Sequence, residues 1–231
     1  INLIKEITLK LYPRNLLLNQ LKLDQNNSKD NYEFDCKKKD HVVAEILYIA
    51  SNALSSQSIY PLSNFYLNLA KFLNPDFHTF DTLQAENFFK INDYEKAIAI
   101  YKRLSRYGDA FKWYSSKQIS RILILDGKKE KSIKYLSQAY DDLDSKSIYE
   151  TYDYAEFLKN NEEFKDSIKF YTEILDKIDS KHPLFADVKD GRGVAYERVG
   201  KWEKAEKDLL ASLDSNPNQA YVINYLAYSW I

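Results

Sequence analysis

The chain has few of the residues that end helices, form tight turns or bridge distant segments. Its 231 residues include five glycines, five prolines, one cysteine and no methionine. So few turn-forming residues argue against a barrel or sandwich, which needs many tight turns. The single cysteine, Cys36, excludes an internal disulfide framework and a cysteine-only zinc site, although it does not identify the redox compartment.

An excess of charge and long apolar runs are also missing. The 33 basic and 34 acidic residues give a net charge of -1, so nothing in the composition favours nucleic acid or anionic membranes. No apolar run approaches the roughly 18 residues of a membrane span. Lys5, Glu6 and Lys10 interrupt the N-terminal stretch, which is therefore not a signal-peptide core. We expect no nucleic-acid partner and no direct membrane insertion.

The chain begins at Ile1 and lacks methionine, so we expect it to be part of a longer protein. Any targeting segment would then lie upstream. Both a periplasmic and a cytoplasmic location stay open.

The most regular stretch is GVAYERVGKWEKAEKDLLASLDSNP, residues 193–217. Small and apolar residues recur there at the three-to-four-residue spacing of a helix with one buried face. Gly200 separates two such runs, and Asn216-Pro217 ends the second. The pattern predicts two antiparallel helices joined by a short turn.

The same pattern recurs at intervals of about 34 residues. Units begin at Ala44, His78, Trp113, Ile148 and Ala186, with a truncated one from Ala220. Position 8 of each unit holds a small residue: Ser51, Ala85, Ser120, Ala155, Gly193 and Ala227. Position 20 does too: Ser63, Ala97, Ser132, Ser167 and Ala205. Because helices approach closely only where side chains are small, we expect these positions to lie buried where the paired helices cross.

These units resemble tetratricopeptide repeats, and the resemblance covers residues 44–231. It implies an all-α fold, a right-handed superhelical α-solenoid of antiparallel helix pairs. Residues 1–43 are predicted to comprise a divergent partial repeat and a polar loop, with the loop at residues 24–40. The segments AEILYIASNALSSQSIYPLSNFYLNLAKFLNPD and NYLAYSW also resemble long repeat proteins of alphaproteobacteria.

The residues that usually carry chemistry form no catalytic or metal-binding pattern. His41, His78 and His182 are not at metal-ligand spacing, and Cys36 lies in the polar segment as an unpaired thiol. Gly191-Arg192-Gly193 falls inside a predicted helix and lacks the lysine of a phosphate loop. Asp187, Asp190 and Glu197 are interpreted as helix charges rather than as an acid/base pair. We therefore predict a non-enzymatic protein with no cofactor and no metal.

The resemblance implies that the first helices of successive units line a concave groove, with positions 2, 5, 9, 12 and 13 facing into it. The clamp of lysine, asparagine and arginine that grips chaperone C-termini in some relatives is absent: Asn52 matches it, but Tyr48 replaces a lysine. Apart from the amide Asn52, the predicted partner-binding residues are aromatic, aliphatic or basic: Tyr48, Asn52, Phe89, Tyr114, Lys117, Arg121, Ile124, Leu125, Tyr149 and Tyr152. Packing between neighbouring first helices is the alternative role for the aromatic ones.

Adjacent aliphatic residues in the groove, Ile124 and Leu125, need a cover. The candidates are an external partner or the segment 1–23 folded into the groove. We favour the partner, because residues 1–23 are expected to stack at the end of the array instead.

The function that these patterns favour is a scaffold that binds a protein or an apolar or amphipathic peptide through the groove. The alternatives are a regulatory or substrate-docking array of a larger enzyme, or an envelope assembly factor. The helix predicted at Tyr221–Trp230 has no second helix to cover it, so we expect Tyr225, Leu226 and Trp230 to mediate a homodimer.

Overall fold

A computed structural model describes residues 8, 11–26 and 34–229 of the chain. Within these residues the regular elements are α-helices, and strands are absent. The predicted all-α fold is therefore confirmed. The helices are α2 (Leu16–Asn26), α3 (Lys39–Ser56), α4 (Tyr60–Leu73), α5 (Thr79–Lys90), α6 (Tyr94–Leu104), α7 (Asp109–Leu125), α8 (Lys129–Asp141), α9 (Ile148–Asn160), α10 (Phe164–Leu175), α11 (Phe185–Arg198), α12 (Trp202–Ser215) and α13 (Ala220–Ser229).

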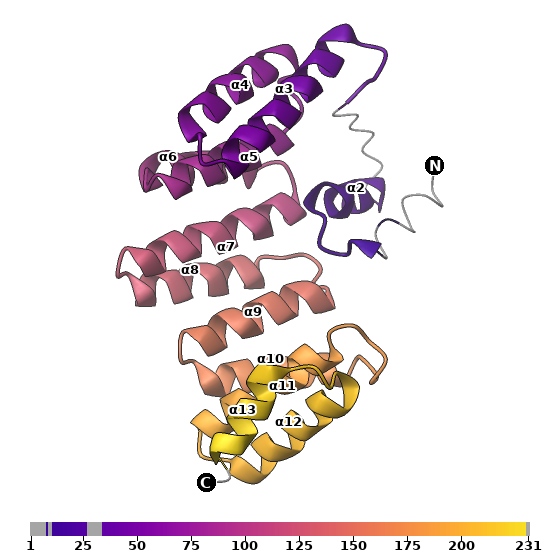
Figure 1. Cartoon of the computed structure of the whole chain (residues 1–231), viewed down its shortest axis with the longest axis vertical. Helices are drawn as coiled ribbons and strands as arrows, with labels where there is room; N and C mark the ends of the chain where they lie inside the picture. Colours follow the sequence, from indigo (N-terminus) through magenta and orange to yellow (C-terminus); the bar gives the residue numbers. More distant parts are fainter. Residues whose placement is uncertain (1–7, 9–10, 27–33, 230–231) are drawn as a thin grey trace. The chain divides into compact units, whose positions relative to one another are not determined.

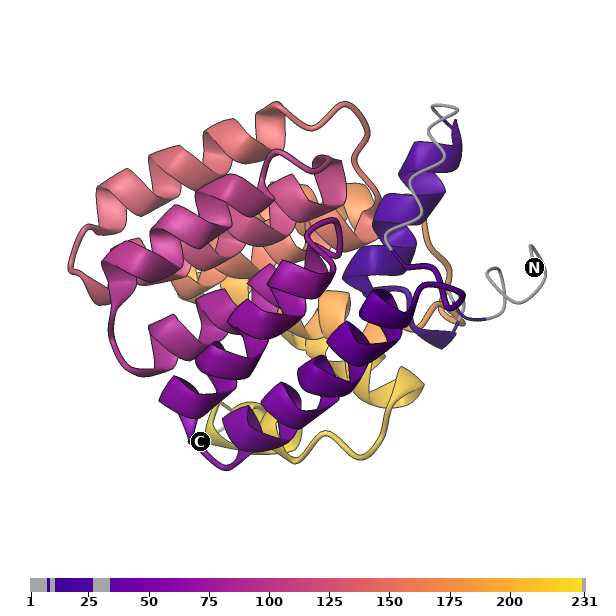
Figure 2. The same cartoon turned by 90° about the horizontal axis from the view of Figure 1, so that it is seen from above.

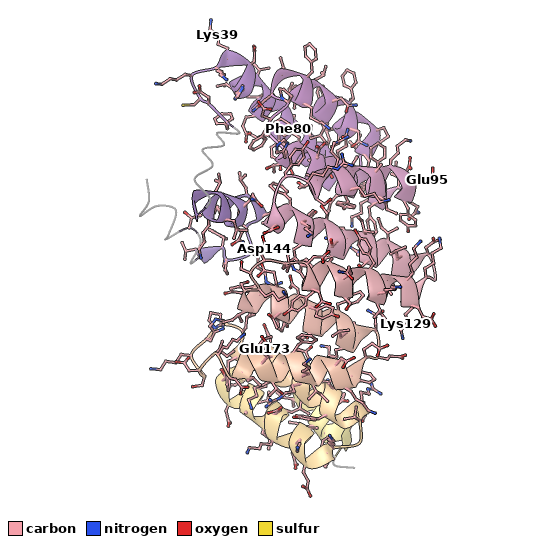
Figure 3. All side chains as sticks on the ribbon, turned by 180° about the vertical axis from the view of Figure 1, so that it is seen from behind. Lys39, Phe80, Glu95, Lys129, Asp144 and Glu173 are labelled. Atoms are coloured by element: carbon pink, nitrogen blue, oxygen red, sulfur yellow. The ribbon has the colours of Figure 1, made fainter. Side chains whose placement is uncertain are left out.

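The chain divides into two compact units, Ile1–Leu143 (unit 1) and Asp144–Ile231 (unit 2). In unit 1 the pairs α3–α4, α5–α6 and α7–α8 stack in sequence order (Figure 1). Unit 2 contains the pairs α9–α10 and α11–α12, followed by the single helix α13. Phe80 on α5 points into the interior of unit 1 and is 1% exposed (Figure 3).

The small residues predicted at the crossings are buried in all five helix pairs. Ser51 and Ser63 of the first pair are fully buried, and the Ser63 hydroxyl donates to the Ser51 carbonyl oxygen at 2.8 Å. Ser132 donates in the same way to Ser120, at 2.7 Å. At Gly193 even a methyl group would lie 2.8 Å from Leu209 Cγ, too close for a real contact. The small side chains are thus a steric requirement of the fold.

Ala227 also occupies position 8 but is exposed, because the described residues contain no helix that pairs with α13 as α12 pairs with α11. Ala227 is therefore consistent with the burial of position 8 in the five helix pairs, because that burial requires a partner helix that crosses at this position.

The turn between the paired helices has the same backbone geometry in every pair. Position 15 adopts a positive φ, between 60° and 75°, at Ser58, Asn92, Gly127, Glu162 and Gly200. The next residue donates its N–H back to the carbonyl of position 11, as Asp93 does to Phe88 at 2.9 Å and Lys201 does to Tyr196 at 2.9 Å. This is the Schellman arrangement, which ends a helix with one left-handed residue. Glycine fits it best, and three of the five turns have another residue there.

Helix α2, the main described part of the N-terminal segment, lies where we did not expect it; residues 1–7, 9 and 10 are outside the described residues. Residues 1–23 were predicted to stack at the end of the array, but α2 lies beside α7 in both views (Figures 1 and 2). Gln20 accepts the Ala110 N–H at 3.0 Å, and its side chain lies over Gly108, where a Cβ would be 2.1 Å from Gln20 Nε2. Leu16 packs against the core cluster that includes Phe111.

The polar loop predicted at residues 24–40 is also shorter than expected. Helix α2 continues to Asn26, and α3 begins at Lys39 with Asp40 in its first turn, where a negative charge stabilises a helix. His41, two residues into α3, is already buried.

Helix α13 is covered by its own chain more fully than predicted. Leu226 was expected to face solvent but is 2% exposed, because it packs with Val194 and Leu209. Tyr225 is half-buried, and its hydroxyl donates to Glu197 Oε2 at 2.6 Å. Trp230, the third predicted contact residue, lies outside the described residues.

The helix crossing can be tested in α6, where a buried and an exposed alanine are two residues apart. Ala97 is fully buried and Ala99 is exposed. We expect Ala97→Leu to overpack the α5–α6 crossing and to lower the free energy of unfolding by about 1–3 kcal/mol. Ala99→Leu should change it by less than about 0.5 kcal/mol. Urea unfolding followed by circular dichroism measures both, and equal stability of the two variants would contradict the crossing.

The turn geometry predicts a stabilising substitution. Glu162 has φ 70°, a conformation that costs a residue with a Cβ more than it costs glycine. We expect Glu162→Gly to raise the free energy of unfolding by about 0.5–1 kcal/mol. Glu163→Gly, at φ -81° one residue later, is the control and should not stabilise. The left-handed turn would be contradicted if both substitutions lowered stability equally.

Candidate functional site

A cavity of about 450 Å³ lies in unit 2 among the first helices of successive pairs. Its lining comes mainly from α9, α11 and α13, at positions that the repeat pattern assigned to the groove. The lining residues are Lys159, Asn160, Glu162, Phe164, Asp190, Val194, Arg198 and Tyr221. We call this cavity the unit 2 pocket.

Asp190 is the unusual residue of the unit 2 pocket. Its Oδ1 atom is buried and has no hydrogen-bond partner among the described residues. Burial raises the pKa of the Asp190 carboxyl to about 6; Lys159 opposes this shift, while the negative charges of Glu156 and Asp187 add to it. A buried carboxylate oxygen without a donor is costly, so this atom is prepared to accept a hydrogen bond from a ligand.

A network of hydrogen bonds in unit 2 holds the charged side chains of Glu156 and Lys159 in place. Lys159 Nζ donates to both carboxylate oxygens of Glu156 at 2.9 Å, one helical turn apart on α9. The Tyr171 hydroxyl, from α10, donates to the same carboxylate. Gly191 leaves room for this pair, because a Cβ there would lie 2.6 Å from the Tyr171 hydroxyl oxygen. The network occupies Glu156 and Lys159 and leaves Asp190 as the unpaired acceptor.

An exposed arginine adds a positive charge to the lining of the unit 2 pocket. Arg198 is largely exposed, and its Nε lies 3.5 Å from Glu197 Oε2. Tyr225 donates to that same Glu197 oxygen, and its ring lies tilted against that of Tyr221, with the ring centres 5.9 Å apart. Tyr221 is 60% exposed. A ligand would therefore meet a buried acceptor, an exposed guanidinium, and the side chains of Val194 and Tyr221.

The predicted groove residues of unit 1 are partly used by the chain's own packing. The Arg121 guanidinium lies 4.4 Å from the centre of the Phe89 ring, and the Lys117 ammonium lies 5.9 Å from that of Trp113. Tyr114 is half-buried and meets the Tyr101 ring edge-on, at 6.1 Å.

The remaining predicted residues of unit 1 differ in exposure. Tyr48 lies 5.2 Å from the ring of Phe80, and the exposed Asn52 donates to the Tyr48 carbonyl. Ile124 is half-buried, whereas Leu125 is 56% exposed. Leu125, Asn52 and Arg121 are thus the most accessible of the predicted residues in this unit.

In unit 2 the predicted aromatic residues do not line the pocket. Tyr149 lies 6.3 Å from the ring of His182, and Tyr152 lies 6.4 Å from that of Tyr171. Both pack against the core cluster built around Tyr171 and Val188. Most of the predicted site residues are aromatic, whereas Asp190 was interpreted as an ordinary helix charge. One sequence signal could have indicated this pocket: charged residues occupy groove positions in two successive first helices, Lys159 at position 12 and Asp190 at position 5.

The histidines are involved in local structure. His41 Nδ1 accepts the Asp35 N–H at 3.1 Å, and His182 Nδ1 accepts that of Leu184 at 3.1 Å. His78 stacks on Tyr107, with ring centres 3.3 Å apart. Among the described residues no cluster of histidine, cysteine and acidic side chains is arranged to hold a metal, and no helix is long and apolar enough to cross a membrane.

Comparison with known proteins gives matches among solved structures alone. No family model matches the chain, and no curated protein does. YrrB, described as a tetratricopeptide-repeat protein with an unusual peptide-binding site, matches with a TM-score of 0.52 and 16% identity, over 78% of this chain and 90% of its own. MamA matches with a TM-score of 0.53 and 15% identity, over 78% and 94%.

A third match is the Podosopora anserina putative kinesin light chain with nearly identical repeats of this type. Its TM-score is 0.58 at 10% identity, and the match covers 76% of this chain and 96% of that one. Identities this low establish the fold alone. This chain has the fold of the tetratricopeptide-repeat proteins.

Proposed function

We propose that this chain is a non-enzymatic scaffold that binds an extended protein or peptide segment in the unit 2 pocket. The unpartnered, buried oxygen of Asp190 in a pocket lined by first helices carries this proposal. The fold supports it, since stacked repeats present their first helices as a binding surface. The peptide-binding site named for YrrB is a precedent within the same fold.

The chemistry of the pocket favours a peptide with a donor and an acceptor a short distance apart. Asp190 accepts a hydrogen bond from a backbone N–H, a lysine or an arginine of the ligand. Arg198 at the mouth donates to a carbonyl or carboxylate of the same ligand. Tyr221 and Val194 supply apolar contact, so the pocket combines an anchor with two orienting charges.

The exposed groove residues of unit 1 are proposed as a second contact region for a protein partner. Leu125 needs a cover, and Arg121 and Asn52 offer donors beside it. Self-association through α13 also stays a prediction. Because Leu226 is buried, that contact would depend on the exposed Ile223 and Tyr228.

The proposal can be tested with peptides selected from a random display library on the purified chain. We expect Asp190→Asn to weaken binding of the selected peptides about 10- to 100-fold, because it removes the negative charge that strengthens the hydrogen bond and puts an NH2 donor beside the remaining acceptor oxygen. Tyr228→Ser, an 81% exposed position outside the pocket lining, is the matched control and should bind normally. Failure to select any peptide, or equal binding by both variants, would contradict the pocket.

Binding should also depend on pH through Asp190. The raised pKa means that the folded chain holds the Asp190 proton more tightly than the unfolded chain does. The contribution of this group to the free energy of unfolding therefore falls as pH rises from the unfolded value of 3.8 to about 6. A cationic peptide needs the ionised carboxylate of Asp190, and this group is mostly ionised only above that pH. We expect affinity to rise between pH 5 and 7 in the parent, about tenfold at most, and to stay flat in Asp190→Asn. Fluorescence anisotropy measures this, and a parallel pH profile in the variant would refute the assignment.

A further inference from the structure

The first helix pair of unit 1 carries an apolar surface that no described residue covers. We call it the α3–α4 face. All its members are large hydrophobic residues between 38% and 84% exposed: Val42, Val43, Ile46, Ile49, Leu62, Phe65, Leu69 and Phe72. Side chains of these two helices project from the end of unit 1 in Figure 3.

Helix geometry puts this face on the side of the pair away from α5. Tyr48 packs on Phe80 of α5, and Ile46 lies two residues earlier, about 200° round the helix. The same offset relates Leu62 to Asn64, which accepts a hydrogen bond from Asn87 of α5. It also relates Leu69 to Lys71, which pairs with Asp81 of α5. Both helices therefore turn one side to α5 and an apolar side away from it.

The face is almost free of charge. Residues 42–73 contain only two charged side chains, Glu45 and Lys71, although 29% of the whole chain is charged. Lys71 is engaged with Asp81, on the α5 side of the pair. Depletion of charge combined with large apolar and aromatic residues marks the centre of a protein interface.

The exposed fractions of the eight side chains together equal about four whole residues, or roughly 600–800 Å² of apolar surface at about 150–200 Å² each. The largest apolar patch on a typical monomer is about 300–600 Å². A stable dimer buries about 800 Å² on each partner. The face is thus large for a solvated surface and close to the size that one side of a dimer needs.

We propose that the α3–α4 face binds the same face of a second copy of this chain. A different partner is usually selected by charge pattern, and this face offers almost none. A twofold contact requires only that the surface complement itself, and two pairs of apolar helices satisfy this by packing as a four-helix layer. The net charge of -1 adds little repulsion between copies.

Sedimentation equilibrium of the chain tests the proposal. The parent should approach twice its mass of 27.2 kDa as concentration rises. Ile46→Glu and Leu69→Glu place a charge in the contact on both copies, and we expect each to weaken the dimer at least about 100-fold. Both positions are exposed in the monomer, so circular dichroism should show an unchanged helix content.

Ile223→Glu on α13 is the matched control, an exposed isoleucine outside the face, and its dimer should persist. The proposal is overturned if the parent is monomeric at every concentration. It is equally overturned if Ile223→Glu dissociates the dimer while Ile46→Glu does not, since the contact then lies on α13. None of these outcomes depends on peptide binding by the unit 2 pocket.

Discussion

Close approach between the two helices of each pair is the constraint on which the rest of the structure depends. Small residues at positions 8 and 20 let the backbones meet, and at Gly193 not even a methyl group fits. The left-handed residue at position 15 then sets where the second helix begins. Once both are fixed, the first helices of neighbouring pairs lie side by side within each unit, and the surface they share is the one that we propose for binding.

The proposed binding function depends on which buried polar atoms of the first helices lack a partner. The buried carboxylates of Asp81 and Asp208 are paired with Lys71 and Arg192, each on the preceding helix. Removal of either partner would leave an uncompensated buried charge. Asp190 has a buried oxygen without a partner and a raised pKa, at the wall of a cavity. The difference between paired and unpaired buried carboxylates separates structural charges from the candidate site.

The sequence alone was sufficient for the helix pairs, because small residues recur at a fixed spacing and their burial follows from sterics. It was insufficient for α2, whose position depends on Gln20 meeting Gly108, contacts that no local pattern encodes. Leu226 was misjudged because its cover comes from Val194 and Leu209 on two earlier helices. Asp190 was undervalued for the same reason: the pocket that contains it is formed by residues of α9 and α13 as well as of its own helix.

The carboxyl group of Asp190 offers the most direct test of the central claim. Its ¹³C resonance, assigned by its loss in Asp190→Asn, reports the pKa of this one group with and without a selected peptide. The account predicts a pKa of about 6 in the free chain and a fall when a cationic peptide binds. Titration near the ordinary value for aspartate, unchanged by the peptide, would contradict it.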